Sequence, residues 1–379
     1  MWYHFAMISI LRLIATYMAV LTLLAAVVGF FFPGTFLVFE HIFKELFAAT
    51  MFSLGVVLNR SDLLITLKHP LRIGLGVFTQ FVVMPLLAFG IVTLAGLPPA
   101  LALGFIIVGS APGAMASNVI VYLAKGALAY SIALTTVATF LAPFVTPMLI
   151  ELFANQNIDV NPLKLMWTIF YILVIPLAGG MLMRLYLDKG FSLKRFVLHT
   201  IGALIVLGLF HFFANFLVWQ QLLAFSFLVG LPLLTSLRRP GQAEPILNWA
   251  KEIAPAIASL SIIIICAYAV AQNQQSIGKV GGWVMALVIL LNALGYLTGW
   301  FLAKFYRFDR THQITLAIEI GMQNAGMGVA LALAHFKDQP EVALPGALFA
   351  VWCIITAAGA SAYFRRKSDR QAVTSAGAV

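Results

Sequence analysis

The stretch GSAPGAMASNVIVYLAKG, residues 109–126, places proline, glycine, serine and asparagine inside a long apolar run. Pro112 has no N–H to donate and disfavours helical geometry at Ala111, while Gly113 removes side-chain restraint. A helix through this run is therefore expected to break. Its broken ends would expose N–H groups with partial positive charge and carbonyl oxygens. A proline kink without functional consequence is the alternative interpretation.

The composition is that of a membrane protein. Apolar residues form 62% of the 379 positions, charged residues only 9%, and the mean hydropathy is +1.00. Apolar runs of roughly 20 residues must be helical in lipid, because every backbone polar group has to be satisfied internally. We expect an all-α polytopic membrane protein with twelve spans, near residues 9–29, 35–58, 70–95, 99–123, 127–153, 163–187, 197–217, 221–237, 246–271, 281–303, 312–335 and 343–364.

The basic residues indicate how the chain is oriented, because lysine and arginine collect on the cytoplasmic side. When alternate loops are assigned to one side, that side receives all but four of the 23 basic residues. The remaining four are Lys44, Lys164, Lys279 and Lys337. This distribution predicts that both termini are cytoplasmic. It also explains the net charge of +10 by topology rather than by nucleic-acid binding.

A second polar interruption occurs in the penultimate predicted span, EIGMQNAGMGVALA, residues 319–332. Transporters built from inverted repeats carry two interrupted helices at corresponding positions, with the binding site between them. Glu319 is a carboxylate that costs roughly 2.5–3.5 kcal/mol to place in a bilayer core, so it requires a partner, a proton or a cation. A protonated structural glutamate is the alternative. We favour a bound cation.

Ligand types near the two interruptions indicate which cation would bind. The sequence offers hydroxyls, amides, freed carbonyls and one carboxylate, with no histidine or cysteine among them, which suits sodium rather than a soft metal. The candidate side chains are Gln80, Ser117, Asn118, Ser131, Thr135, Glu319 and Gln323. Each hydroxyl taken singly is typical of a bond to its own helix backbone, so only the set indicates a site. Cys266 and Cys353 have no metal or redox spacing.

Two segments resemble the signature segments of the bile acid:sodium symporter (BASS) family: APGAMASNVIVYLAKGALAYSIALTTVATFLAPFVTP and EIGMQNAGMGVALALA. The resemblance implies a ten-helix inverted-repeat (5+5) fold with core and panel domains and crossed broken helices. The implied divisions are a first repeat at 1–158, the start of the second at 159–195, an inserted transmembrane hairpin at 196–243, the remainder at 244–368 and a cytoplasmic tail at 369–379.

The resemblance also implies site residues. One sodium site would be formed by Ser117, Asn118, Ser131, Thr135 and Glu319. A second would be formed by Gln80, Glu319, Ile320, Met322 and Gln323, with Ile320 and Met322 contributing backbone oxygens. Substrate would lie near Met115, Ala116 and Asn324, where an anion would meet N–H groups at a helix start.

The activity implied by the resemblance is secondary active transport: sodium-coupled symport of a bile-acid-like or small carboxylate anion by alternating access. The protein would lie in a bacterial inner membrane, with sodium, the anion and lipid as partners and with no other cofactor. Two features depart from the family pattern. Ala114 and Met115 stand where many relatives have glycine and threonine, and the hydrophobic hairpin is inserted.

Three other interpretations remain open at this stage. A proton-coupled transporter of the same fold would use Glu319 as the proton carrier. An integral-membrane enzyme would need a nucleophile with a base, a metal cluster or paired carboxylates, and apart from Glu319 no acidic residue falls deep in a predicted span. A non-transporting scaffold has no positive support. His199 and His211 in the hairpin are interpreted as interhelical hydrogen-bonding residues rather than a metal site.

Overall fold

A computed structural model describes residues 13–14, 17–58, 69–154, 160–189, 192–214, 224–230 and 243–376. Within these ranges the secondary structure is helical, without β-strands. Six helices are long and apolar enough to cross a membrane: 70–95, 128–153, 162–189, 253–272, 274–305 and 340–365. Shorter apolar helices cover 20–31, 99–109, 196–209 and 325–335. The expectation of an all-α membrane protein is confirmed.

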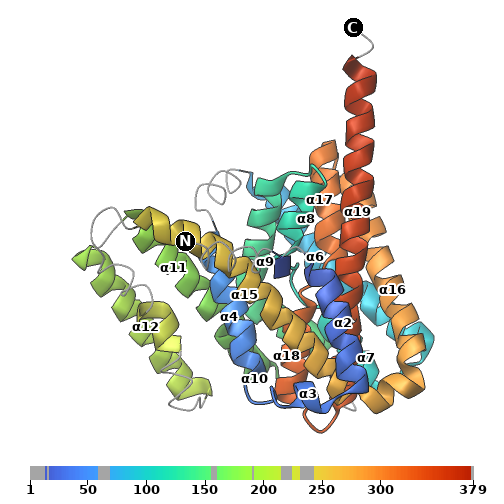
Figure 1. The fold of residues 1–379 in the computed structure, drawn as a ribbon, viewed down its shortest axis with the longest axis horizontal. Coiled ribbons are helices and arrows are strands. Elements are labelled where there is room, and N and C mark those ends of the chain that lie inside the picture. The colour runs from blue at the N-terminus through green and yellow to red at the C-terminus, as the bar shows by residue number, and fades with distance from the viewer. Residues whose placement is uncertain are drawn as a thin grey trace. The chain divides into compact units, whose positions relative to one another are not determined.

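The chain forms two compact units, and each half of the chain contributes to both. Unit 1 comprises residues 1–58 and 163–268, and unit 2 comprises 59–162 and 269–379. The first-half helices of unit 2 are α6 (Pro70–Ala95), α7 (Pro99–Gly109), α8 (Ser117–Leu123) and α9 (Leu128–Phe153) (Figure 1). Its second-half elements are α16 (Gln274–Phe305), α17 (Arg310–Gly321), α18 (Ala325–His335), the 3₁₀ turn η3 (Pro340–Ala343) and α19 (Leu344–Ala376).

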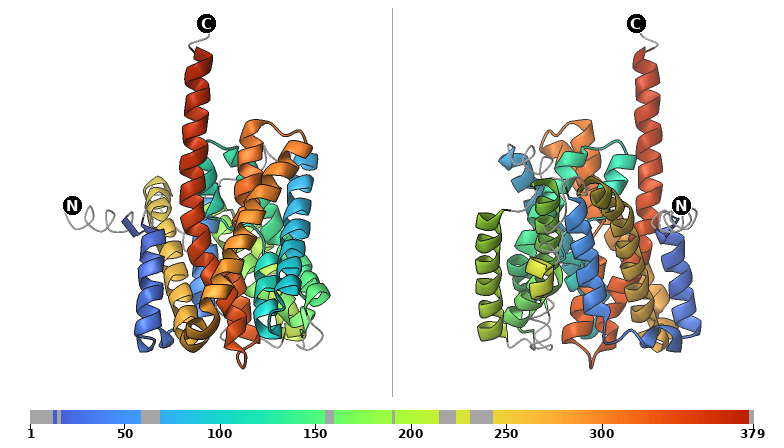
Figure 2. Two further views of the ribbon diagram at one scale, coloured as in Figure 1. Left: turned by 90° about the vertical axis from the view of Figure 1, so that its right-hand side faces the viewer. Right: turned by 60° about the vertical axis from the view of Figure 1, so that its left-hand side comes forward.

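Small residues allow the helices of unit 2 to approach closely. A Cβ at Gly299 of α16 would lie 2.8 Å from the carbonyl oxygen of Leu316 in α17, and one at Gly109 of α7 would lie 2.8 Å from that of Met84 in α6. Close backbone contact of this kind is typical of membrane helices, where packing rather than the hydrophobic effect drives association. The far end of α19 extends beyond its neighbours in this unit (Figure 2).

Unit 1 contains α2 (Met18–Phe31), α3 (Gly34–Leu37), α4 (Phe43–Val57), α10 (Pro162–Ile169), η1 (Phe170–Val174), α11 (Ile175–Lys189), α12 (Leu193–Ala214), η2 (Ser226–Gly230) and most of α15 (Ala243–Gln272). α4 and α11 pack through paired glycines. A Cβ at Gly55 would collide with the backbone oxygen of Leu177, and one at Gly180 with that of Phe52. These two helices therefore pack backbone to backbone.

Two predicted spans differ from the observed elements. The span predicted at 35–58 is not one helix, because turns at 38–42 separate α3 from α4. The span predicted at 163–187 contains a π-helical turn at 170–174 just before Pro176. Proline lacks the N–H of a regular helix and its ring crowds the carbonyl four residues earlier, which a π-bulge accommodates.

Parts of other predictions lie outside the described residues. These are the start of the first span, residues 215–223 and 231–242 of the predicted hairpin, and residues 377–379 of the predicted tail.

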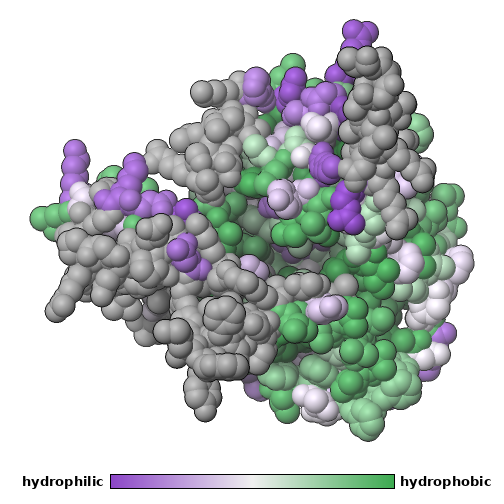
Figure 3. Space-filling view, turned by 45° about the horizontal axis from the view of Figure 1, so that its top comes forward, coloured by the Kyte–Doolittle hydropathy of each residue, from purple (hydrophilic) through white to green (hydrophobic). Residues whose placement is uncertain are grey.

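Large hydrophobic side chains are exposed along the outer sides of the helices, as expected for a protein surrounded by lipid. On α16 they include Leu290, Leu297, Phe301 and Phe305. Figure 3 shows hydrophobic residues covering the side of the molecule on which α16 lies in Figure 1. Such a surface is unfavourable in water and suits a bilayer.

Candidate functional site

Both predicted helix breaks are present in unit 2, and they meet. α7 ends at Gly109 and α8 begins at Ser117, while α17 ends at Gly321 and α18 begins at Ala325. The two linkers pair as a short antiparallel bridge between Gly113 and Gln323. Ala114 N–H donates to the Met322 oxygen at 2.8 Å, and Asn324 N–H donates to the Pro112 oxygen at 2.9 Å. Part of the backbone freed by each break is thus satisfied by the other, as lipid requires.

The carboxylate of Glu319 lies at the end of α17, next to this bridge, and is 1% exposed. Its Oε1 accepts hydrogen bonds from Ser117 of α8, at 2.6 Å, and from Ser131 of α9. Its Oε2 accepts one from Thr135 at 2.8 Å. The three hydroxyls are themselves buried. Two helices, α8 and α9, therefore direct three hydroxyl groups at one buried acid on a third helix, α17.

Asn118 of α8 completes this oxygen cluster. Its Oδ1 lies 2.8 Å from the hydroxyl of Ser131, which is one turn before Thr135 on α9. Gly113 provides the space for the acid, because a Cβ at this position would lie 2.8 Å from Oε2 of Glu319. The structure thus brings together all five residues of the first predicted sodium site. Carboxylate, hydroxyl and amide oxygens are the ligands that hard cations prefer.

The second predicted sodium site adjoins the first at Gly113, where an added Cβ would also lie 3.9 Å from Oε1 of Gln80. Gln80 Nε2 donates to Gln323 Oε1 at 2.7 Å and to the Ala111 oxygen at 3.1 Å. Gln323 Nε2 donates to the Ile320 oxygen at 2.8 Å. The Met322 oxygen accepts the N–H of Ala114. These residues are gathered at the same crossing, although several of their oxygens already accept hydrogen bonds.

The three predicted substrate residues line the crossing, but their helix starts are already capped. Met115 is buried and Ala116 half-buried before α8. The N–H groups of residues 117–119 donate to the carbonyls of residues 114–116. Asn324 Oδ1 accepts the N–H of Met327 at 3.1 Å and so caps α18. An incoming anion would have to compete with these bonds for the N–H groups.

Asn292 and Thr315 support the site and were not identified from the sequence. Asn292 of α16 is buried, and its Nδ2 donates to the Gly321 oxygen at 2.8 Å, at the end of α17. Thr315 Oγ1 accepts the N–H of Ala127 at 2.8 Å and so ties the start of α9 to α17. Asn292 could have been identified from the sequence, because it is a single asparagine in the apolar run of α16. Nothing in the sequence indicates the partner of Thr315.

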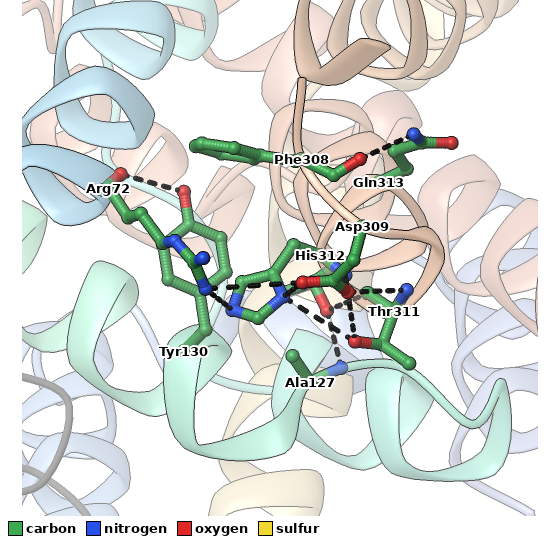
Figure 4. A network of polar contacts seen from close by, with 9 residues as sticks. Arg72, Ala127, Tyr130, Phe308, Asp309, Thr311, His312 and Gln313 are labelled. Atoms are coloured by element: carbon green, nitrogen blue, oxygen red, sulfur yellow. Dashed lines mark hydrogen bonds and ion pairs between the residues drawn. The ribbon is translucent and has the colours of Figure 1, made fainter. Parts of the chain in front are cut away.

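A second polar network lies at the starts of α6, α9 and α17 (Figure 4). Asp309 caps α17 by accepting from the N–H groups of Thr311 and His312, and its Oδ2 lies 2.7 Å from His312 Nδ1. Arg72 of α6 lies 4.0 Å from Asp309, and Tyr130 donates to the Arg72 backbone oxygen at 3.1 Å. This network brings together three loops that the distribution of basic residues assigns to one membrane side.

The charge state of Asp309 follows from its contacts. Partial burial alone would raise the pKa of this carboxyl group, but the hydrogen bonds from Thr311 and His312 outweigh burial and hold the pKa below its usual value. Asp309 is therefore an anion at neutral pH. Its charge also suits the N-terminus of a helix.

A multi-pass helical membrane protein with a buried acid at two crossed, broken helices has the features of an ion-dependent transporter. Comparison with known proteins agrees with this class. The model of the sodium bile acid symporter family matches residues 46–226. An uncharacterized sodium-dependent transporter of Bacillus subtilis, YocS, is 30% identical over 346 residues, which cover 91% of this chain and 90% of that protein. The chain belongs to the sodium bile acid symporter family.

Plant relatives extend the same comparison. The probable chloroplastic sodium/metabolite cotransporter BASS1 of Arabidopsis thaliana is 27% identical over 322 residues, covering 85% of this chain and 66% of that protein. The probable chloroplastic sodium/metabolite cotransporter BASS2 of Oryza sativa subsp. japonica is 27% identical over 359 residues, covering 94% of this chain and 72% of that protein. These relatives are named as transporters, and the chain is a transporter rather than an enzyme.

Proposed function

We propose that this protein is a secondary active transporter that couples the uptake of a small organic anion to the entry of sodium. The observation that carries the proposal is the oxygen cluster around Glu319, where three hydroxyls from two helices meet one buried carboxylate. One relative is named a sodium-dependent transporter and others are named sodium/metabolite cotransporters, which supports sodium as the coupling ion. The proposed ligands are those of the two predicted sites, with Glu319 shared between them.

The local chemistry supports cation binding over a purely structural acid. The hydrogen-bond partners of Glu319 are neutral hydroxyls, so they solvate its charge without cancelling it. An ion pair or a bound cation would lower the cost of keeping a carboxylate in the membrane. Sodium can take the oxygens of Glu319, Ser117 and Thr135 as ligands once the hydroxyl protons rotate away. The bound sodium would balance the negative charge of Glu319 without a lysine or arginine side chain.

The arrangement of unit 2 supports the proposed inverted-repeat fold. Both halves of the chain contribute the same series to this unit: a long helix, a broken helix and another long helix. The series is α6, α7–α8 and α9 in the first half, and α16, α17–α18 and α19 in the second. We propose that unit 2 is the core domain and unit 1 the panel domain. The repeats would divide the chain at the predicted boundaries, 1–158 and 159–368, around the inserted hairpin 196–243.

Alternating access would follow from sodium binding at the crossing. Sodium would join the three helices around Glu319 and favour one orientation of the core, and the anion would bind beside it near Met115, Ala116 and Asn324. Two sodium ions entering with one monoanion carry one net positive charge inward. At a typical potential this contributes about 2.3 kcal/mol per 100 mV to uptake. A bacterial inner membrane with cytoplasmic termini is the proposed location.

Uptake by purified protein in liposomes tests this function. An inward sodium gradient should drive uptake of an organic anion, and Glu319→Gln should abolish both uptake and stabilisation of the protein by sodium in thermal unfolding. A panel of bile-acid-like anions and small carboxylates should be screened by sodium-dependent thermal stabilisation before the transport assay.

A comparison of gradients separates sodium coupling from proton coupling. Uptake that ignores sodium and follows an inward proton gradient would contradict the sodium proposal and favour Glu319 as a proton carrier. Gln339→Ala, on the exposed loop after α18, provides a variant of a polar residue away from the site. It should retain the sodium response of the unmodified protein.

A further inference from the structure

An elongated groove runs along one side of unit 2, between α16, α17 and α19. Two hollows of about 250 and 370 Å³ adjoin each other, because both are lined by Tyr296 and Leu297. The first also contains Trp300, Arg310 and Phe364. The second also contains Asn292, Ala293, Trp352, Thr356 and Ala360. From Asn292 to Trp300 the groove follows α16 for about 12 Å at the rise of a helix.

The two ends of the groove differ in chemistry. At one end the Arg310 guanidinium lies 4.3 Å from the centre of the Trp300 ring, which stacks on Phe364 at 5.5 Å. Beyond this aromatic stack the lining is mainly apolar, and Leu297 on its edge is 52% exposed. A positive charge at one end of the groove and an apolar lining along the rest of it suit an amphiphile with an anionic head.

Several buried polar atoms of residues that line the groove lack hydrogen-bond partners within the described part of the chain. They include Nε of Arg310, Nε1 of Trp352 and Oδ1 of Asn292. Such groups are costly to bury and are usually paired with protein or another molecule. Their alignment in one groove indicates that a ligand with both acceptor and donor groups completes it.

We propose that this groove binds an anionic phospholipid from the surrounding membrane. Its phosphate would bind Arg310, and one acyl chain would lie on the strip formed by Ala293, Leu297 and Ala360. The exposed apolar residues on the outer side of α16 mean that an occupant can enter from the bilayer. Arg310 also lies at the end of unit 2 that carries the exposed Arg307, on the predicted cytoplasmic side, where anionic lipids attract basic residues.

The groove contacts the segment that ends at the helix crossing. Its Tyr296 ring packs on Gly321 so closely that a Cβ there would lie 2.5 Å from the ring, and its Asn292 bonds the Gly321 oxygen. Gly321 is the last residue of α17, two residues after Glu319. A lipid that fills the groove therefore stabilises the residues that hold the end of α17.

Lipid binding by the full-length protein in detergent tests the proposal. Native mass spectrometry and thermal unfolding should be measured while phosphatidylglycerol or phosphatidylcholine is added. Phosphatidylglycerol should give one retained lipid and a saturable rise in Tm, and phosphatidylcholine should give less of both. Arg310→Gln should weaken phosphatidylglycerol binding roughly tenfold, the effect of losing a charged hydrogen bond. Arg307→Gln is the matched control and should bind as the unmodified protein does.

A second variant keeps the test valid if loss of Arg310 disturbs folding. Ala293→Trp adds volume at an exposed position, so it fills the apolar end of the groove without making a cavity, and it should remove the retained lipid.

Equal losses of phosphatidylglycerol binding in Arg310→Gln and Arg307→Gln would overturn the proposal in favour of general surface charge. Equal stabilisation by the two lipids would also overturn it. So would loss of transported-anion binding in Ala293→Trp with phosphatidylglycerol binding retained, because the groove would then be a substrate site.

Discussion

At the scale of single residues, the hydroxyl groups of unit 2 differ in what they bond. Several bond backward to their own helix, as Thr79 does to Leu75 and Thr136 to Ile132. Ser117 and Ser131 instead donate to Glu319, and Thr135 does both. Sequence alone does not separate these kinds, because a hydroxyl four residues after a carbonyl always has the local option. The position of the buried acid determines that Ser117, Ser131 and Thr135 bond outside their own helices.

Adjacent threonines allow a matched test of this distinction. Thr135→Val removes a hydroxyl that reaches Glu319, whereas Thr136→Val removes one that bonds only its own helix, and both side chains are buried. We expect Thr135→Val to weaken sodium binding roughly tenfold, as for loss of an interaction with a charged group. Thr136→Val should leave sodium binding unchanged. Titration of sodium-dependent thermal stabilisation measures both, and similar shifts in the two variants would contradict the assignment.

At the scale of elements, the sequence predicted that the fourth and penultimate spans break, and it located both breaks. Pro112 and Gly113 indicated the first directly, and the glycines around Glu319 indicated the second. The meeting of the two breaks was inferred from general transporter architecture and from the family resemblance, because Gly113 and Gln323 lie 210 positions apart and no local pattern encodes their contact. The turn after α3 was missed, since hydropathy alone does not distinguish one helix from two that share an apolar run.

The start of α17 gives a prediction at this scale. Asp309 accepts the first N–H groups of the helix, and loss of such a cap costs about 1 kcal/mol of stability. Because the pKa of Asp309 is lowered, its contribution is present above the unfolded pKa and is lost only as pH falls through the lower folded value. Asp309→Ala should therefore lower Tm at about pH 5 as well as at pH 8.

Thermal unfolding in detergent at the two pH values measures this effect. Asp338→Ala, at an exposed position in the loop after α18, is the control and should leave Tm unchanged. Hydrogen exchange at the amides of Thr311 and His312 should accelerate in Asp309→Ala alone. If the destabilisation vanished at pH 5, Asp309 would be protonated there and the assigned charge state would be wrong.

At the scale of the whole molecule, every residue of the proposed cation sites belongs to unit 2, although residues 163–268 of unit 1 separate its two contributing segments. Unit 2 is completed only when α16–α19 have been made, so Glu319 gains its hydroxyl partners late in synthesis. The composition predicted the membrane class, and the basic residues grouped the loops correctly at one end of unit 2. The division into two units was not readable from the order of the sequence, because each unit is assembled from both halves of the chain.

The inserted hairpin provides the last prediction, because its described residues contact α11, another helix of unit 1. His199 of α12 lies 2.9 Å from the Tyr186 hydroxyl of α11, and the Phe227 backbone packs so closely on Gly179 that a Cβ there would lie 2.5 Å from its oxygen. Deletion of residues 197–237 should lower Tm through loss of these contacts. Sodium-driven uptake in liposomes should persist, because the proposed ligands all lie in unit 2. Complete loss of uptake by a deletion variant that inserts normally and is still stabilised by sodium would instead assign the hairpin a direct part in transport.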